Sequence, residues 1–167
     1  MRRVLAVLVV VALVFPASFA SADEITDWTH HMFQSAKDMA VSPLVITRHA
    51  AMVNAAMFDA VNGVNPVYES IHVAPDSVAT DGASARAAAV QAAYLILTRL
   101  YPAEVGDLTV QRTASLAGIA ESPAAIDKGV AWGNTVGEAI WTFCLTDGFS
   151  MGRRYIRAAM RSGSGGH

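Results

Sequence analysis

The stretch from Ser42 to Asn62 constrains the fold most, because apolar residues occur nearly all the way round it when it is placed on a helix. Ser42 can cap such a helix and Pro43 suits its first position, whereas Asn62-Gly63 provides a stop. A helix that is apolar on most sides must be surrounded by other helices. The sequence therefore predicts an all-α bundle of about five helices around a central buried helix 43–62.

Polar residues share one side of this predicted helix, and they include Arg48, Asn54 and Asp59, whereas His49 lies within the apolar arc. Arg48 and Asp59 are eleven residues apart, which is about 16 Å along a helix and too far for a direct ion pair. Each therefore needs a partner from another element, since an unpaired buried charge is costly. We expect Arg48, Asn54 and Asp59 to bond between helices, and His49 to be a satisfied core residue with a ring nitrogen on a carbonyl.

The first 22 residues have the pattern of a secretory signal. Arg2 and Arg3 precede an apolar run that ends at Phe15, and the small residues Ala20-Ser21-Ala22 follow. This pattern predicts cleavage before Asp23 and a periplasmic or secreted protein; the alternative, an uncleaved anchor, requires a longer run of about 20 residues. No later stretch predicts a transmembrane helix, so we expect no membrane association after signal cleavage.

The mature chain of 145 residues has ten basic and fourteen acidic side chains. It has no basic stripe with interleaved aromatic residues, which argues against nucleic-acid binding. Cys144 is the only cysteine, so an intramolecular disulfide is excluded. We expect its thiol to be buried and inert, because no His or Lys lies at helical spacing to activate it.

Four further helices are predicted, at residues 23–40, 83–101, 102–120 and 122–146. A long loop is expected at 63–82, and a flexible basic tail with four arginines at 149–167, after a helical domain at 23–148. In the last helix, glycines recur at every fourth residue. Because this spacing forms one smooth stripe, we expect another backbone to approach it closely. The stripe consists of Gly129, Gly133 and Gly137.

Several histidines are candidate metal ligands. Asp27 and His31 have i, i+4 spacing, beside His30, and His72 lies in the predicted loop. Two ligands do not make a site, and spacing fixes no third, so we interpret Asp27, His30 and His31 as an exposed polar face. A loop histidine such as His72 is likewise interpreted as a surface residue.

The segments TDWTHHMFQSAK and TRHAAMVNAAMFDAVNGVNPVYES resemble the N-terminal helical part of bacterial vanadium-dependent haloperoxidase-like proteins. These belong with the type-2 phosphatidic-acid phosphatase superfamily. The LYPAE turn at 100–104 and the helix end at Thr146-Asp147-Gly148 agree, so the resemblance covers about residues 24–148. It implies an all-α fold in which vanadate or a substrate phosphate is held by C-terminal motifs. Those motifs are a Lys before an Arg-Pro, a Ser-Gly-His element, and an Arg followed by a His.

This chain contains none of those motifs. Lys37 and Lys128 are its only lysines, neither precedes an Arg-Pro, and the terminal Ser164-Gly165-Gly166-His167 has an extra glycine. No catalytic, cofactor-binding or metal residue is therefore carried over, and we expect no cofactor in this chain, although complete family members hold vanadate or phosphate. The resemblance implies the N-terminal portion of such a protein, inactive alone. We interpret the arginine-rich end as divergence, truncation or a shifted reading frame, and a separate chain as a candidate source of the missing C-terminal half.

Two alternatives remain open. The first is a small periplasmic helical module for interaction or self-association, which the glycine stripe and the polar side of helix 43–62 suggest. The second is an independent hydrolase or metal enzyme that uses His30, His31, His49 or His72.

Overall fold

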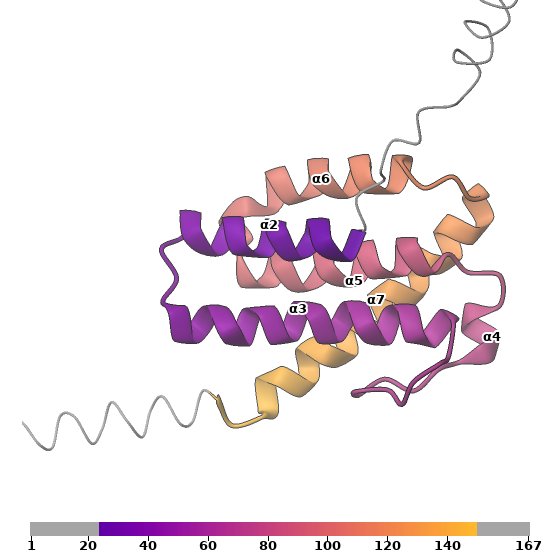
Figure 1. Cartoon of the computed structure of the whole chain (residues 1–167), viewed down its shortest axis with the longest axis horizontal. Coiled ribbons are helices and arrows are strands. Elements are labelled where there is room, and N and C mark those ends of the chain that lie inside the picture. Colours follow the sequence, from indigo (N-terminus) through magenta and orange to yellow (C-terminus); the bar gives the residue numbers. More distant parts are fainter. Residues whose placement is uncertain (1–23, 150–167) are drawn as a thin grey trace, which may run out of the picture.

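The computed structural model describes residues 24–149, and within this range all regular structure is helical (Figure 1). The helices pack together, so the predicted all-α class is confirmed. The five longer helices are α2 (Glu24–Asp38), α3 (Pro43–Val64), α5 (Ala85–Leu100), α6 (Val105–Ala117) and α7 (Pro123–Thr146). The short elements are α4 (Ser77–Thr80) and a 3₁₀ turn, η1 (Pro102–Glu104). The predicted signal at 1–22, and residues 150–167 of the predicted tail, lie outside the described residues.

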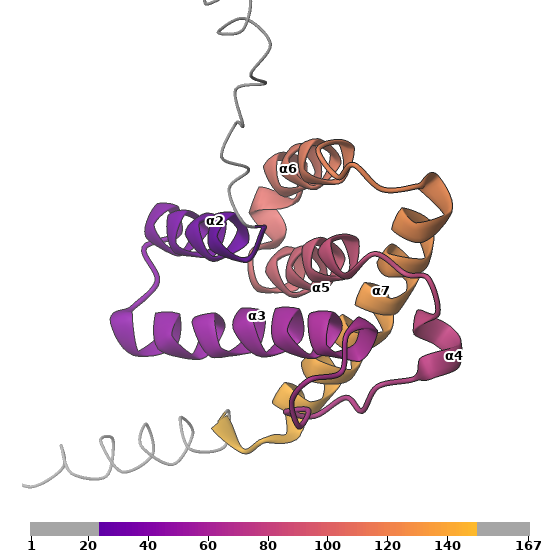
Figure 2. The ribbon, with the colours of Figure 1, turned by 45° about the vertical axis from the view of Figure 1, so that its right-hand side comes forward.

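The helix at the centre is α5 rather than α3. It contacts α2, α3, α6 and α7, and it lies between α3 and α6, while α2 packs on both α3 and α5 and α7 crosses α3 and α5 obliquely (Figures 1 and 2). Most of its alanines are fully buried, and their small side chains allow neighbours to approach on several sides. By contrast, α3 is well buried only from Met52 onwards, and Leu44 in its first turn is 76% exposed.

The helix boundaries differ from the predicted ones by a few residues. A turn with a positive φ of 48° at Ala40 closes the segment after α2, which ends at Asp38. Helix α3 continues to Val64, where the backbone N–H of Asn65 bonds to the carbonyl of Val61. Pro43 occupies its first turn as predicted, but the Ser42 side chain makes no capping bond.

At the next boundary, Pro102 starts the 3₁₀ turn instead of an α-helix, and α6 ends at Ala117. The predicted loop 63–82 also contains a helix, α4. The Asp76 carboxylate caps this short helix by accepting the backbone N–H groups of Val78 and Ala79.

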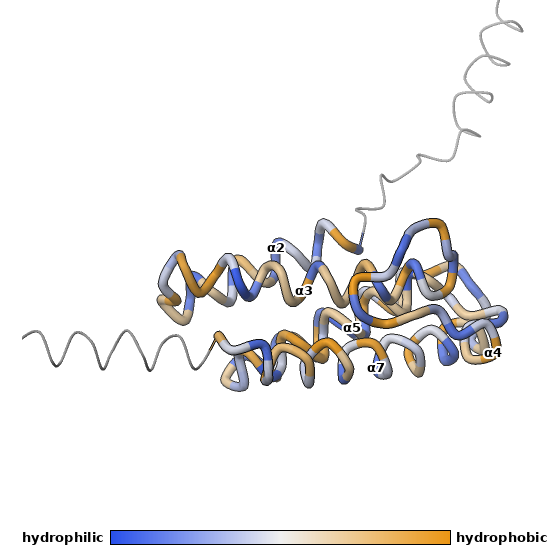
Figure 3. The backbone as a smooth tube through the Cα atoms, turned by 90° about the horizontal axis from the view of Figure 1, so that it is seen from below, coloured by the Kyte–Doolittle hydropathy of each residue, from blue (hydrophilic) through white to orange (hydrophobic). Residues whose placement is uncertain are grey.

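Hydrophobic and hydrophilic residues alternate along helices such as α2 and α7 (Figure 3), and the apolar residues of the bundle meet inside. Trp28 and Met32 of α2 are fully buried, whereas Phe33 of the same helix is 50% exposed. The loop after α3 packs unequally: Val73 contacts the core, but Tyr68 and Ile71 stay mostly exposed. Among the described helices, none is long and apolar enough to cross a membrane.

The glycine stripe of α7 lies against α5, as predicted. A Cβ atom added at Gly133 would lie 2.9 Å from Cβ of Gln91 and would also clash with the backbone carbonyl of Ala88. A Cβ atom at Gly129 would meet the Ser84 carbonyl in the same way. The missing side chains therefore let the two backbones approach closely.

Candidate functional site

Asp59 holds the loop that follows α3. Its side chain is fully buried, and its two carboxylate oxygens accept the backbone N–H groups of Ile71, His72 and Val73, each at 2.8 Å. The predicted need for a partner from elsewhere is confirmed. The partner is loop backbone rather than another helix, because three consecutive N–H groups of an irregular segment have no helical acceptor.

Asn62 fixes the earlier part of the same loop. Its side-chain oxygen accepts the N–H groups of Val67 and Tyr68, at 3.0 and 2.9 Å, and its amide donates to the Tyr68 carbonyl at 2.8 Å. The sequence interpretation used Asn62 only as a helix stop. The two buried polar side chains at the end of α3 thus serve the loop 65–73.

Arg48 joins α3 to the end of α7. Its guanidinium donates to the Asp147 carboxylate at 2.5 Å and to the Cys144 carbonyl at 2.6 Å, and it stacks over the Phe149 ring at 4.2 Å. This contact confirms the expected bond between helices. The Arg48 side chain is also the main reason why the pKa of the Asp147 carboxyl lies below its ordinary value.

Asn54 also bonds between helices as expected. Its side-chain oxygen accepts the Thr29 hydroxyl of α2 at 3.3 Å, while its amide donates to the Ala50 carbonyl of its own helix. Polar side chains of α3 therefore form hydrogen bonds to other segments at positions from Arg48 to Asn62.

His49 is half-buried, and its Nδ1 lies 2.7 Å from the Tyr101 hydroxyl, with the two rings edge to face. Burial raises the pKa of Tyr101 to about 12, so the phenol keeps its proton; the imidazole tautomer sets which of the two groups is the donor of the hydrogen bond. Burial, together with the positive charge of Arg48, lowers the pKa of His49. The predicted satisfied histidine is confirmed, but its partner is a phenol instead of a carbonyl.

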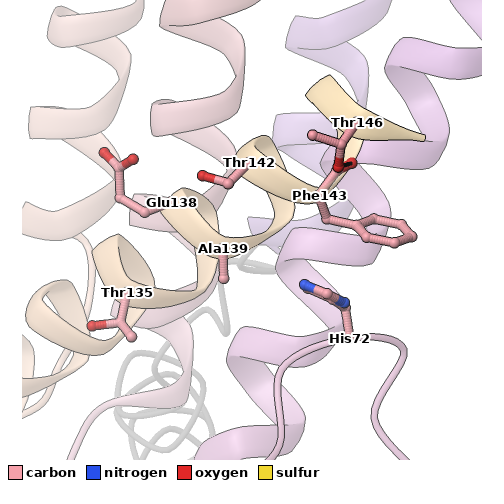
Figure 4. Close-up of a pocket in the computed structure, with 7 residues that line it drawn as sticks. All are labelled: His72, Thr135, Glu138, Ala139, Thr142, Phe143 and Thr146. Carbon is pink, nitrogen blue, oxygen red and sulfur yellow. Dashed lines mark hydrogen bonds between the residues drawn. The ribbon is translucent and has the colours of Figure 1, made fainter. Parts of the chain in front are cut away.

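His72 lies in an open groove of about 600 Å³ beside α7 (Figure 4). Its imidazole stacks on the Phe143 ring, with 4.4 Å between ring centroids. Glu138 and Thr142 line the same groove but point away from the imidazole, and Glu138 forms an ion pair with Arg99. The groove therefore does not bring an acid and a base together.

A second, smaller groove of about 210 Å³ lies between α3, α7 and Ile71, and we call it the α3–α7 groove. Apart from the engaged pair Arg48 and Asp147, its lining is apolar or a thiol. The lining consists of Arg48, Ala51, Met52, Ala55, Ile71, Ile140, Phe143, Cys144 and Asp147.

The other predicted candidates lie apart from both grooves or are not activated. His31 packs edge to face on Trp28, and burial is the largest cause of its lowered pKa. Within residues 24–149, no three His, Cys, Asp or Glu side chains are close enough together to hold a metal ion. Burial raises the pKa of the half-buried Cys144 thiol, although Arg48 lies near it and acts in the opposite direction.

Sequence reasoning missed Tyr101, which it treated as the end of a helix, and the roles of Asn62 and Phe143. The Tyr101-Pro102 pair was a signal for a helix end only, and no spacing rule connects Tyr101 to His49.

Comparisons of the chain with protein-family models, with curated proteins and with solved structures give no match.

Proposed function

We propose that this chain is a non-catalytic helical scaffold, corresponding to the N-terminal helical part of a vanadium-dependent haloperoxidase-like protein. The resemblance of the segments around TDWTHHMFQSAK and AAMFDAVNGVNPVYES supports the family. The scaffold role rests on one observation, which is that the polar side chains of α3 are engaged in holding the structure.

The Arg48 guanidinium and the backbone N–H groups bonded to Asp59 are the kinds of donor that bind an oxyanion when they are free. Binding vanadate or phosphate needs several free cationic or N–H donors around one point. Arg48 already bonds to Asp147 and Cys144, and three loop N–H groups already bond to Asp59. Recruiting any of them to an anion would leave a partner unsatisfied.

The proposal is tested on the chain from Asp23 to His167, prepared without the predicted signal segment. We expect neither bromide-dependent peroxidase activity with vanadate nor hydrolysis of an aryl phosphate, and no vanadate binding by ⁵¹V NMR. An active haloperoxidase assayed in parallel serves as the positive control. Turnover by the purified chain that is lost in His49→Ala would overturn the scaffold proposal.

Self-association remains a prediction of the sequence. The two features that suggested it are used inside the fold, because the glycine stripe lies against α5 and the polar side of α3 holds the loop and α7. Sedimentation velocity at several protein concentrations measures it directly.

A further inference from the structure

Glycine follows an asparagine or aspartate at three places in the chain, and these dipeptides share one chemical weakness. The backbone nitrogen of the glycine can attack the side-chain carbonyl carbon of the residue before it, because glycine has no Cβ to obstruct the succinimide ring that forms. The attack needs a side chain that is free to turn back onto the following peptide. The three dipeptides are Asn62-Gly63, Asp81-Gly82 and Asp147-Gly148.

The fold protects the first of these dipeptides by burial. Asn62 is 3% exposed near the end of α3, and its side-chain amide is bonded to the loop at Val67 and Tyr68. Gly63 also lies within α3, and the Trp132 ring packs against it. Asn62 therefore reaches the reactive arrangement only when this end of α3 opens locally.

Asp147 is held by hydrogen bonds and charge instead. One of its carboxylate oxygens pairs with the Arg48 guanidinium, and the other accepts the backbone N–H of Phe149 at 3.0 Å. The hydrogen bond from Arg48 is also the main reason why the pKa of this carboxyl lies below its ordinary value. The hydroxyl of a carboxyl group leaves only from the protonated form, so this pairing slows attack at Asp147.

Asp81 has neither kind of restraint. It lies with Gly82 in the turn between α4 and α5 (Figure 2), and both residues are exposed. Within residues 24–149, no ion pair or hydrogen bond reaches the Asp81 carboxylate. Its side chain is therefore free to rotate towards the Gly82 nitrogen.

The geometry of this turn lets the reacting atoms meet. Asp81 has φ −57° and ψ 116°, and Gly82 has a positive φ of 66°. The Ala83 N–H bonds to the Thr80 carbonyl at 2.9 Å, so these residues form a type II turn. The middle peptide of such a turn can flip to the type I arrangement, since glycine accepts either sign of φ. In one of its two directions, this flip carries the Gly82 nitrogen past the Asp81 side chain.

We propose that Asp81 is a site of spontaneous isoaspartate formation in the folded protein, and that the fold protects Asn62 and Asp147 from the same reaction. The Gly82 nitrogen forms a bond to Cγ of the protonated Asp81 carboxyl, whose hydroxyl leaves as water with the proton of the N–H group. Water then adds to the main-chain carbonyl carbon of Asp81 and breaks its bond to the Gly82 nitrogen. The chain now runs through the Asp81 side chain, and its mass is unchanged.

Lys128 of α7 lies where the product carries its new carboxylate. The Lys128 Nζ donates to the main-chain carbonyl oxygen of Asp81 at 2.7 Å. In isoaspartate this oxygen belongs to a free carboxylate, so the hydrogen bond becomes an ion pair. The modified turn thus stays attached to α7, although its backbone is longer by a methylene group just before Ser84, which caps α5. The free carboxylate is the group that protein isoaspartate methyltransferases recognise.

The chain from Asp23 to His167 is incubated at neutral pH, and isoaspartate is counted by methyl transfer from S-adenosylmethionine with a purified isoaspartate methyltransferase. Peptide mapping with endoprotease Asp-N, which does not cleave before isoaspartate, locates the site. We expect Asp81 to be converted about tenfold faster than Asn62 or Asp147, because those two react only after local opening. Asp81→Glu is the matched control, since it keeps the charge but closes a larger ring slowly, and it should lose the methyl-accepting signal.

Incubation in denaturing urea separates the effect of the fold from that of the local sequence. In the unfolded chain we expect Asn62 to react first, because ammonia leaves an amide at neutral pH more readily than water leaves an ionised carboxylate. The order of Asn62 and Asp81 should therefore reverse on folding. An order that is the same with and without urea would overturn the proposal. A folded chain that accepts no more methyl groups than Asp81→Glu, or that is modified first at Asn62 or Asp147, would also overturn it.

Discussion

At the scale of single residues, two buried polar side chains at the end of α3 determine where the following loop runs. Asp59 and Asn62 together accept five backbone N–H groups between Val67 and Val73. Backbone donors in an irregular segment need such acceptors when they are removed from water. The loop is consequently held although Tyr68 and Ile71 contribute little buried surface.

Asp59→Asn tests this role. An amide has only one acceptor oxygen, so at least one of the three N–H groups at residues 71–73 loses its partner. We expect a loss of about 1–3 kcal/mol in the free energy of unfolding, measured by urea denaturation. Asp127→Asn, at an exposed position of α7, is the matched control and should leave stability unchanged within about 0.5 kcal/mol. Equal stability of both variants would show that Asp59 does not hold the loop.

His49 makes stability depend on pH. Its pKa in the folded state is lowered from the ordinary 6.5, chiefly by burial, so the unfolded chain binds the proton more readily. The part of the folding stability that comes from this lowered pKa of His49 is fully present above pH 6.5. It is lost as the pH falls from 6.5 through the lowered pKa of the folded state. His31 acts in the same direction, since burial also lowers its pKa. Glu24 and Asp147 have lowered pKa values too, so their contributions are lost only below pH 4.5 and 3.8.

We therefore expect the free energy of unfolding to decrease between pH 7.5 and pH 5, and to decrease less in His49→Gln than in the unchanged chain. Urea denaturation at the two pH values measures the difference. His31→Gln is the companion variant, and the double variant should be nearly flat over this interval. A slope that does not change on removal of both imidazoles would contradict the assignment.

At the scale of helices, the close contact between α5 and α7 depends on glycines of α7, because glycine has no side chain to keep the two backbones apart. Gly129 and Gly133 face the backbone of α5, whereas Gly137 faces the more adaptable Leu95 side chain at 3.2 Å. The bulky residues Trp132, Val136 and Ile140 of α7 are buried beside this stripe. Trp132 also donates its indole N–H to the Ala60 carbonyl, so α7 is bonded to α3 as well as packed on α5.

Gly133→Ala tests the close approach. Alanine favours a helix over glycine by about 1 kcal/mol, but the new methyl group meets Ala88 and Gln91 of α5. We expect a net loss of about 1–3 kcal/mol in thermal or urea unfolding, because overpacking forces the helices apart. In contrast, Gly106→Ala in α6 meets nothing within 4 Å and should be neutral or stabilising by up to about 1 kcal/mol. If both variants gained stability, the two backbones would not be in contact at Gly133.

At the scale of the whole molecule, helices from both ends of the described chain surround α5. Trp28 of α2 is fully buried, contacts Tyr94 of α5 edge to face, and donates to the Ser115 hydroxyl of α6 at 3.2 Å. Hydrogen bonds also join α6 and α7 through α5, since Gln91 of α5 donates to Asn134 of α7 and accepts from Arg112 of α6. The first and last helices are thus linked through α5 and not mainly to each other.

Trp28→Ala tests whether α2 belongs to the same cooperative unit. Removal of a fully buried indole costs about 3–5 kcal/mol, which is a large share of the roughly 5–15 kcal/mol that stabilises a domain. We expect one transition at lower denaturant, with far-UV circular dichroism and Trp fluorescence coincident. A separate early transition confined to part of the helical signal would show that α2 unfolds independently.

The sequence by itself determined the all-α class, the positions of the five longer helices and the close contact at the glycine stripe. These features follow from the periodicity of apolar residues and from local cap and stop residues, which act within a few residues of one another. The sequence also indicated that Arg48 and Asp59 need partners. An unpaired buried charge is costly, and this holds whichever residue turns out to be the partner.

Only the tertiary structure decided which partners they have and which helix is central. Arg48 meets Asp147 across 99 residues, and His49 meets Tyr101 across 52. Spacing along one helix contains no information about side chains so distant in the chain. The central place of α5 over α3 likewise depends on how closely alanine and glycine let several helices approach at once, which is a property of the packed molecule.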